Sequence, residues 1–277
     1  MSDAMIQKKY HMLPPGSIRK VLALQASPRN ETTSKTEVFL QAFLEGCASA
    51  GAVTETVYLR KKKIARCTGC FTCWTKTPGV CIHKDDVADI MKLEDGADLV
   101  VYAYPLYHFG IISLLKQYIE RTLPRANPQL ILRDDGETTH PLREGFKDAH
   151  HVVVMGVCGF PEVSHFGAAS MHLHYLSNAT GDRGLNIVAE LYRPASEALN
   201  LPFYKEENER VLGATRDAGR QVVEKGTIER RLVDEIAEVK LDIPAFREQA
   251  NAAWDHCVRT AITLPEFQDQ ILGRKPR

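Results

Sequence analysis

Short apolar runs alternate with amphipathic stretches along the chain from residue 19 onward. Apolar runs of about four to eight residues between turn signals are typical of buried strands. A run as apolar as residues 152–157 suits a parallel sheet that is covered by helices on both faces. The pattern therefore predicts a doubly wound α/β domain over residues 18–200. Its five expected strands are residues 21–25, 53–59, 99–104, 151–158 and 185–192.

The segments between these strands show helical periodicity. In residues 34–50, three apolar side chains recur at a spacing of four and so share one helix face. These are Phe39, Phe43 and Cys47. Ser34 and Glu37 have the spacing of a capping box, in which each side chain bonds the backbone N–H of the other. Residues 111–121 form a second expected helix, and a third lies between the fourth and fifth strands.

The two ends of the chain depart from this pattern. Residues 1–17 are expected to form a flexible N-terminal arm that ends in a Pro-Pro-Gly turn. Residues 201–277 have the pattern of charged amphipathic helices, with Gly226 ending one helix and Pro244 and Pro265 beginning others. An amphipathic helix must bury its apolar face. We therefore expect this helical C-terminal extension to dock on the sheet domain or to build a homo-oligomer interface.

Composition and charge exclude several classes of protein. Among 277 residues, 35 Lys and Arg balance 35 Asp and Glu, so the net charge gives no reason to expect nucleic acid or a membrane as a partner. No apolar run reaches the roughly 18 residues of a transmembrane helix. The N-terminus has no secretory signal, and we expect a cytoplasmic protein. Seven cysteines at this length do not make a disulfide scaffold.

The polar segment after the first strand has the composition of a phosphate site. It reads SPRNETTSKT over residues 27–36 and combines hydroxyl groups with an Arg and a Lys ahead of a helix. Free N–H groups at a helix N-terminus, hydroxyl donors and positive charge together favour a phosphate. The alternative is a polar loop in which Ser34 only caps its helix. Neither GxGxxG nor GxxxxGK(S/T) occurs here, which argues against a dinucleotide site and a P-loop.

Two later loops have the composition expected around a planar ring. Residues 104–110 (YPLYHFG) supply aromatic side chains, and residues 156–161 (GVCGFP) supply small ones that let backbone N–H groups approach a ligand. In an open parallel sheet, ligands bind beyond the carboxyl ends of the strands. We therefore expect both loops to meet residues 27–36 at one edge of the sheet.

These motifs together resemble a known family. The SPR…SxT loop, the PLY loop followed by LLKQYIERTLP, and the GxCGFP loop are similar to those of the flavodoxin-fold NADPH-dependent FMN reductases. The similarity is greatest to the iron–sulfur flavoprotein branch, and it covers about residues 19–195. It implies a flavodoxin-like, five-stranded parallel sheet of order 2-1-3-4-5, with FMN at its carboxyl edge.

The resemblance also implies roles for residues in each loop. The first loop would hold the FMN phosphate through Ser27, Arg29, Ser34 and Thr36. The second would flank the isoalloxazine ring with Pro105, Leu106, Tyr107 and His108. The third would close over the ring with Gly156, Cys158, Gly159 and Phe160. No acid or base is assigned because the chemistry belongs to the flavin, and Tyr107 and His108 are the residues expected to contact substrate.

Four cysteines with the spacing C-x2-C-x2-C-x7-C follow the second expected strand and define the cysteine loop, residues 67–81. They are Cys67, Cys70, Cys73 and Cys81. Three thiolates at this spacing can wrap one face of a 4Fe–4S cluster, and the fourth completes the ligand set. Zinc fits less well, because structural zinc sites usually pair two separate C-x2-C knuckles. The motif is also similar to the compact cysteine motif of the iron–sulfur flavoproteins. The alternatives are a packed, reduced loop, or a redox-active disulfide of Cys70 with Cys67 or Cys73.

We interpret the chain as an FMN-dependent NAD(P)H oxidoreductase that passes electrons through bound flavin to a small-molecule acceptor of the quinone, flavin or nitro class. The alternative is an iron–sulfur flavoprotein electron carrier fed by a ferredoxin-like protein donor, without a nicotinamide site. A third interpretation is an interaction module that has lost its cofactor, against which the polar first loop argues. The basic run Arg60 to Lys63 either attracts a nicotinamide nucleotide's phosphate or is a solvated turn.

Overall fold

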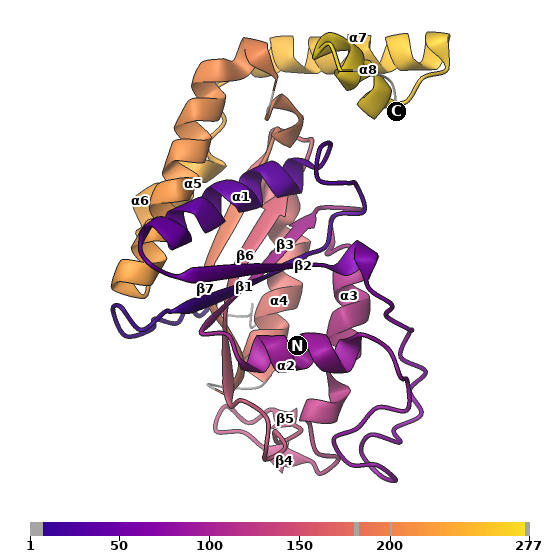
Figure 1. Ribbon diagram of the computed structural model, residues 1–277, viewed down its shortest axis with the longest axis vertical. Coiled ribbons are helices and arrows are strands. Elements are labelled where there is room, and N and C mark those ends of the chain that lie inside the picture. The colour runs from indigo at the N-terminus through magenta and orange to yellow at the C-terminus, as the bar shows by residue number, and fades with distance from the viewer. Residues whose placement is uncertain (1–7, 180–182, 200, 275–277) are drawn as a thin grey trace.

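The computed structural model describes residues 8–179, 183–199 and 201–274. The main sheet has five parallel strands in the order β2-β1-β3-β6-β7 (Figure 1). Counted along the five predicted strands, this is the order 2-1-3-4-5, so the predicted flavodoxin-like fold is confirmed. The strands are β1 (Lys20–Gln25), β2 (Val53–Tyr58), β3 (Leu99–Pro105), β6 (Ala149–Val157) and β7 (Gly184–Arg193).

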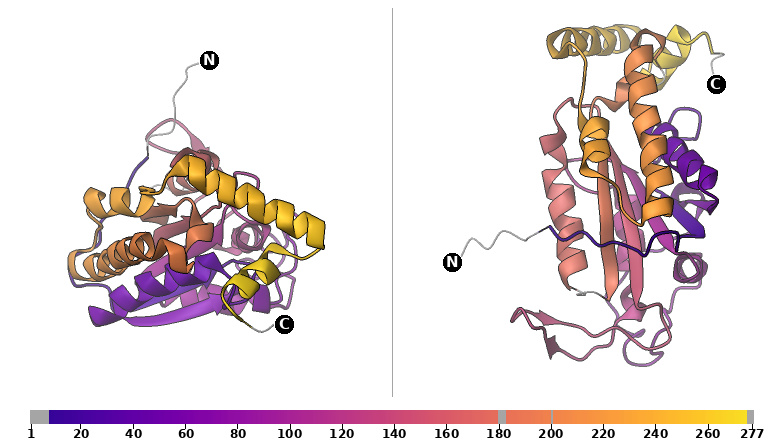
Figure 2. Two further views of the ribbon diagram at one scale, coloured as in Figure 1. Left: turned by 90° about the horizontal axis from the view of Figure 1, so that it is seen from above. Right: turned by 90° about the vertical axis from the view of Figure 1, so that its left-hand side faces the viewer.

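Helices cover both faces of this sheet (Figures 1 and 2). Helices α1 (Lys35–Ser49) and α5 (Lys205–Lys225) pack on one face. Helices α2 (Val87–Asp95), α3 (Ser113–Glu120) and α4 (Gly167–Ala179) pack on the other. Successive residues of β1 alternate between these two apolar cores, because side chains alternate across a strand. Burial on both faces explains why the strands are so uniformly apolar.

Shorter elements connect this framework. The strands β4 (Ile131–Leu132) and β5 (Thr138–Thr139) form an antiparallel hairpin between α3 and β6. The 3-10 turns are η1 (Leu59–Lys61), η2 (Leu123–Arg125), η3 (Val163–Phe166), η4 (Ser196–Ala198) and η5 (Pro202–Tyr204). The sequence pattern indicated neither the hairpin nor these turns.

The C-terminal region continues after α5 with α6 (Arg230–Ala237), α7 (Ile243–Thr260) and α8 (Leu264–Ile271). Gly226 ends α5 in the left-handed conformation with φ 71°, and prolines stand in the first turns of α7 and α8, as predicted. The short helix α6 was not predicted. Within the described residues, no helix combines the length and the apolar composition needed to cross a lipid bilayer.

Helix α1 forms as its sequence predicts, but its cap differs from the expected one. The three apolar residues predicted on one face are fully buried. Ser34 Oγ accepts a hydrogen bond from the N–H of Glu37 at 3.1 Å, which is the first half of a capping box. The Glu37 carboxylate instead accepts hydrogen bonds from Gln25 and from Tyr58, both at 2.9 Å. The second half of the predicted box is therefore wrong, because these two partners hold the carboxylate.

Helix α5 packs so closely against α1 that glycine is required at two positions. A Cβ on Gly46 would lie 2.0 Å from Arg216 O, and a Cβ on Gly219 would lie 2.0 Å from Phe43 O. The apolar side of α5 also belongs to the core beneath α1. Helix α5 therefore completes the layer over one face of the sheet, although it falls within the expected C-terminal extension.

The described part of the N-terminal segment, residues 8–17, lies along the edge of the sheet. The N–H of His11 donates to Ile187 O in β7 at 2.8 Å, and the N–H of Leu13 donates to Gly226 O at 3.0 Å. Leu13 itself is buried. These contacts fix residues that the sequence assigned to a flexible arm, because the outer strand β7 offers backbone groups that need partners. Residues 1–7 of the expected arm lie outside the described residues.

Candidate functional site

Three loops meet at the carboxyl edge of the parallel sheet. Loop 1 is residues 26–34 after β1, loop 2 is residues 106–110 after β3, and loop 3 is residues 158–161 after β6. The N–H of Ala26 donates to Ala103 O at 2.8 Å. The N–H of Leu106, which follows Pro105 at the end of β3, donates to Val157 O at 2.8 Å. The structure therefore brings together the three segments that were predicted to share one site.

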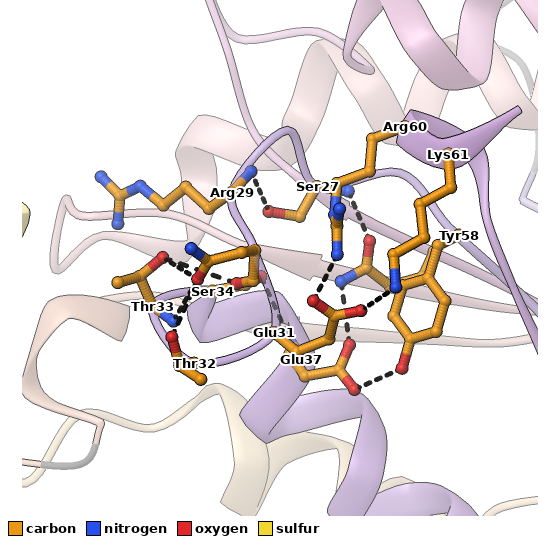
Figure 3. A network of polar contacts seen from close by, with 12 residues as sticks. Ser27, Arg29, Glu31, Thr32, Thr33, Ser34, Glu37, Tyr58, Arg60 and Lys61 are labelled. Carbon is orange, nitrogen blue, oxygen red and sulfur yellow. Dashed lines mark hydrogen bonds and ion pairs between the residues drawn. The ribbon is translucent and has the colours of Figure 1, made fainter. Parts of the chain in front are cut away.

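The side chains of loop 1 form a compact turn ahead of α1 (Figure 3). Ser27 and Ser34 are both buried. Ser27 Oγ accepts a hydrogen bond from the N–H of Arg29 at 3.2 Å. The amide oxygen of Asn30 accepts hydrogen bonds from the hydroxyl and the N–H of Thr33, at 2.8 and 3.2 Å. Asn30, which the sequence did not single out, therefore holds the shape of the turn.

Two cations lie between loop 1 and the segment after β7. Arg29 Nη1 is 3.2 Å from Glu197 Oε1, with both side chains partly exposed. Lys35, in the first turn of α1, donates from Nζ to Leu199 O at 2.6 Å. Burial lowers the pKa of Lys35. Thr36 is buried beside it. Positive charge thus gathers at the N-terminus of α1, where Lys35 adds to the predicted set.

Two further cations reach loop 1 from the end of β2. Arg60 and Lys61 both form ion pairs with Glu31 (Figure 3). The hydrogen bond from Lys61, followed by backbone bonding, lowers the pKa of the Glu31 carboxyl group. The basic run that begins at Arg60 is therefore not simply a solvated turn, because its first two residues face loop 1.

Loop 2 is a tight turn in an unusual backbone conformation. The N–H of Tyr107 donates to Gly110 O at 3.3 Å, and the N–H of Gly110 donates to Tyr107 O at 3.0 Å. The two residues between them, His108 and Phe109, have φ values of 47° and 61°. Side chains other than glycine rarely adopt this left-handed region, and such strain concentrates at functional sites. Tyr107 and Phe109 are both exposed.

The two predicted glycines of the third segment serve different purposes. Gly156 lies within β6, and a Cβ there would come within 2.8 Å of the rings of Phe166 and Tyr192. Its small size therefore makes room for these rings rather than for a ligand. At Gly159 the nearest atom to such a Cβ is 3.8 Å away, on Glu197. Of these two glycines, Gly159 is the one that leaves space beside the backbone at the sheet edge.

Aromatic rings from loops 2 and 3 face one another. The rings of Phe109 and Phe160 are nearly parallel, at 8°, with centroids 6.2 Å apart. The ring of His165, from η3, lies 4.7 Å from that of Phe160. Neither Phe109 nor His165 was assigned to the site from the sequence. Cys158 is buried next to them, its thiol donates to Phe160 O at 3.4 Å, and burial raises its pKa to about 12. Cys158 is therefore an unreactive packing residue at neutral pH.

Helices α7 and α8 extend beyond the sheet on the side of these loops (Figure 2). The Gln268 side chain donates to Glu197 Oε2 at 2.9 Å. Arg274 donates to Thr32 O in loop 1 at 3.3 Å. The C-terminal helices thus contact the candidate site, which the sequence pattern alone did not indicate.

The cysteine loop is separate from this edge. Its four cysteines are free thiols that line one small cavity of about 20 Å³ together with Arg121. Arg121 fixes the segment through Asp85 Oδ2 and Ala65 O, both at 2.7 Å. Arg121 directly follows the C-terminal end of α3, whereas loop 2 lies before the N-terminal end of the same helix. A helix of this length spans about 12 Å, and this span separates the cavity from loop 2.

The thiols of the cysteine loop differ in their surroundings. Hydrogen bonds involving Thr72 and Thr68 lower the pKa of the exposed Cys70. Burial, followed by the charges of neighbouring thiols, raises the pKa of Cys73. Within the described residues, no group of three or more His, Cys, Asp or Glu side chains is placed to hold a metal ion. Four thiols around one cavity nevertheless have the chemistry of a 4Fe–4S site, whose four ligands bind four different irons.

Comparison with known sequences identifies the family. A sequence profile described as flavodoxin-like fold matches residues 19–200, and the chain belongs to this family. An iron-sulfur flavoprotein of Archaeoglobus fulgidus is 33% identical over 105 residues, which are 38% of this chain and 46% of that protein. One of Methanocaldococcus jannaschii is 28% identical over 195 residues, which are 66% of this chain and 98% of that protein. The chain thus spans about half the length of the first relative and nearly all of the second.

Two solved structures share the architecture. The NAD(P)H:quinone oxidoreductase from Methanothermobacter marburgensis has a TM-score of 0.54 at 18% identity, covering 74% of this chain and 98% of that one. An FMN-dependent NADH-azoreductase from Bacillus anthracis, solved in complex with FMN, has a TM-score of 0.53 at 17% identity, covering 74% and 100%. At these identities the likeness establishes the fold.

Proposed function

We propose that the chain binds FMN at loops 1 to 3 and is an FMN-dependent NAD(P)H oxidoreductase that reduces a small-molecule acceptor. The observation that carries this proposal is the meeting, at one sheet edge, of a hydroxyl-rich basic loop and two loops with exposed aromatic rings. The names of the similar proteins, which include an NAD(P)H:quinone oxidoreductase and an FMN-dependent azoreductase, support the same assignment.

Loop 1 fits the phosphate of FMN. The first N–H groups of α1 have no acceptor within the helix and lie next to the hydroxyl group of Ser34, while Ser27 is buried at the start of the same loop. Arg29 and Lys35 add positive charge at the same point. Together, a helix N-terminus, hydroxyl donors and cations stabilise a bound phosphate.

Loops 2 and 3 fit the isoalloxazine ring. When bound, FMN supplies hydride acceptance and electron transfer, so the protein needs to bind, orient and tune it. Phe109 and Phe160 offer exposed apolar ring faces against which the isoalloxazine ring could pack. The N–H of Tyr107 donates to Gly110 O, whereas Gly159 has open space beside its backbone, so the N–H of Gly159 is better placed than that of Tyr107 to donate toward negative charge on the ring.

Removal of one hydroxyl group tests the phosphate site. Ser34→Ala deletes a hydrogen bond to a charged group, worth about 1.5–3 kcal/mol. The Kd for FMN should therefore rise about 10- to 100-fold in titration calorimetry. Ser49→Ala is the matched control, because Ser49 lies at the opposite end of α1 and bonds only Gly46 O at 2.7 Å. Equal FMN affinity in the two variants, with both folded, would exclude loop 1 as the phosphate site.

A second candidate function is favoured by the cysteine loop. Four free thiols around one cavity support a 4Fe–4S cluster, and two relatives are named iron-sulfur flavoproteins. A chain with such a cluster and no nicotinamide site would be an electron carrier fed by a ferredoxin-like donor. Negligible NAD(P)H oxidation by protein that holds both cofactors would favour the carrier over the reductase.

Iron and acid-labile sulfide measured on anaerobically purified protein test the cluster. A 4Fe–4S centre requires about four of each per chain. Cys73→Ser should lower both contents. Cys257→Ser, at a buried cysteine of α7 far along the chain from the cysteine loop, should leave them unchanged. Protein that is purified and reconstituted without oxygen and holds FMN but neither iron nor sulfide would show that the four cysteines form only a packed loop.

A further inference from the structure

A large cavity lies between the C-terminal helices and the candidate flavin edge. Its volume is about 1180 Å³, which exceeds the ~300–1,000 Å³ of ordinary ligand pockets. Its walls come from loop 3, η5, α7 and α8. Six aromatic side chains belong to the lining: Phe160, Phe203, Tyr204, Phe246, Trp254 and Phe267. The matched family profile ends at residue 200, so most of this wall is built by sequence outside it.

The wall contributed by the helices is fixed to the sheet domain by specific contacts. The Tyr204 hydroxyl donates to Gln249 Oε1 of α7 at 2.6 Å. Phe246 of α7 is buried against Ala195 and Ala198, next to the end of β7. Together with the bond from Gln268 to Glu197, these contacts hold both helices over the edge. The cavity is therefore a built feature of this chain rather than a gap beside a loose tail.

The cavity opens onto the proposed flavin site. Arg29 of loop 1 and Gly159 and Phe160 of loop 3 belong both to the three loops and to the cavity lining. Any molecule that fills the cavity therefore has one end against the loops proposed to hold the ring. That placement suits the partner in an electron transfer, which must approach the ring closely.

The charges on the lining favour an anion over a cation. Three arginines and two glutamates line the cavity, a balance of one positive charge. Arg29 pairs with Glu197, and Arg247 pairs with Glu162 at 3.4 Å. Arg259 donates from Nε to Asp255 O of its own helix at 3.3 Å and, within the described residues, forms no ion pair. Arg259 is thus the positive charge that a ligand can neutralise.

We propose that this cavity is the acceptor site and takes flat, fused-ring aromatic quinones that carry an anionic group. The proposal rests on the proposed function and names its substrate class. Such a quinone gains two electrons and two protons and becomes the hydroquinone. NAD(P)H supplies a hydride, which carries both electrons and one proton equivalent, and is oxidised to NAD(P)⁺. The second proton comes from water. The aromatic side chains of the lining offer ring faces against which fused rings can stack.

Tryptophan fluorescence tests binding independently of activity. The chain has two tryptophans, and only Trp254 lines the cavity, whereas Trp74 lies in the cysteine loop. With anthraquinone-2-sulfonate as the probe, Trp74→Phe should retain saturable quenching and Trp254→Phe should lose it. The same titration works on protein without FMN, so it reports on the cavity even if the flavin proposal is wrong.

Three variants then test the lining. Phe267→Ala should weaken binding of the sulfonate at least tenfold, whereas Val258→Ala, on α7 but outside the lining and 79% exposed, should not. Arg259→Gln should weaken binding of the sulfonate several-fold more than binding of 2-hydroxymethylanthraquinone, which has the same rings without the charge. With FMN and NAD(P)H present, kcat/KM for the sulfonate should exceed that for 1,4-benzoquinone in the native chain and fall in Phe267→Ala.

The outcomes separate the two proposals. Failure to bind FMN or to oxidise NAD(P)H with any acceptor overturns the proposed function and the role of the cavity as an acceptor site, whereas binding of the aromatic anion in the cavity would stand. Quenching that persists in Trp254→Phe, or equal affinity in Phe267→Ala and Val258→Ala, overturns the cavity as the acceptor site. The cavity is also excluded as the acceptor site if the probe quenches fluorescence only under conditions in which light scattering shows a dissociated monomer. A second copy of the chain would then occupy the cavity.

Discussion

The crossing of α1 and α5 can be tested with a single methyl group. A Cβ on Gly219 would lie 2.0 Å from Phe43 O and 3.1 Å from Cys47 N. Both atoms belong to the backbone of α1, so neither can rotate away as a side chain would. Gly219→Ala must therefore push the two helices apart. Because α1 begins at loop 1, this displacement also disturbs the proposed phosphate site.

The expected magnitude follows from two opposing effects. Forcing an extra methyl group into a packed core costs about 1–3 kcal/mol, and contact with rigid backbone places Gly219→Ala near the upper end. Replacing Gly by Ala in a helix gains up to about 1 kcal/mol. The net loss of unfolding free energy should be about 2 kcal/mol. Gly213 lies in the same helix, and no atom lies within 4 Å of a Cβ built on it. Gly213→Ala should therefore show only the increase in unfolding free energy that alanine brings to a helix.

Urea denaturation of both variants, followed by far-ultraviolet circular dichroism, measures this difference. We expect Gly213→Ala to exceed Gly219→Ala by about 3 kcal/mol in unfolding free energy. FMN affinity should fall in Gly219→Ala and stay unchanged in Gly213→Ala. Equal stability of the two variants would refute the close packing of α5 on α1. Helix α5 would then not be part of the sheet domain.

The buried Glu190, the backbone of loop 2 and the exposed face of α7 can each be tested with one substitution. Burial opposes ionisation of Glu190, but the polar side chains around its carboxylate outweigh this effect and lower its pKa, with the largest contribution from His174, whose Nε2 lies 3.4 Å from Oε2. The ionised carboxylate therefore stabilises the fold above its unfolded pKa of roughly 4.3 and loses this effect as the pH falls, so Glu190→Gln should flatten the acid limb of stability measured by urea denaturation. His108→Gly should raise stability by up to about 1 kcal/mol, because it relieves a φ of 47°, yet lower kcat/KM for the acceptor; unchanged kcat/KM would remove this residue from the site. Val258→Glu, on the exposed face of α7, should lower the mass measured by light scattering, and an unchanged mass would contradict a homo-oligomer interface there.

The sequence predicted those parts of the fold that a local pattern controls. The buried strands and the periodic face of α1, with Phe39, Phe43 and Cys47, appear where the apolar spacing placed them. Gly226, Pro244 and Pro265 mark helix ends because their backbone preferences act locally. The hairpin β4–β5 and helix α6 are too short for a periodic signal to identify them.

What the sequence could not show depends on contacts between distant segments. The pairing of Arg29 with Glu197 joins residues 168 positions apart, and the bond from Gln268 to Glu197 brings the C-terminal helices to the site. An amphipathic pattern predicts that α5 and α7 have apolar faces, but it does not indicate which segments cover those faces. Gly156 was assigned to a ligand loop, whereas its neighbours Phe166 and Tyr192 show that it serves packing.

Titration of the flavin-free protein with FMN, followed in the visible spectrum under anaerobic conditions, tests the central claim most directly. We expect saturation at about one FMN per chain, with bleaching of the bound flavin on addition of NAD(P)H and recovery on addition of a quinone. Folded protein that binds no FMN in this titration would contradict the assignment of loops 1 to 3 as a flavin site.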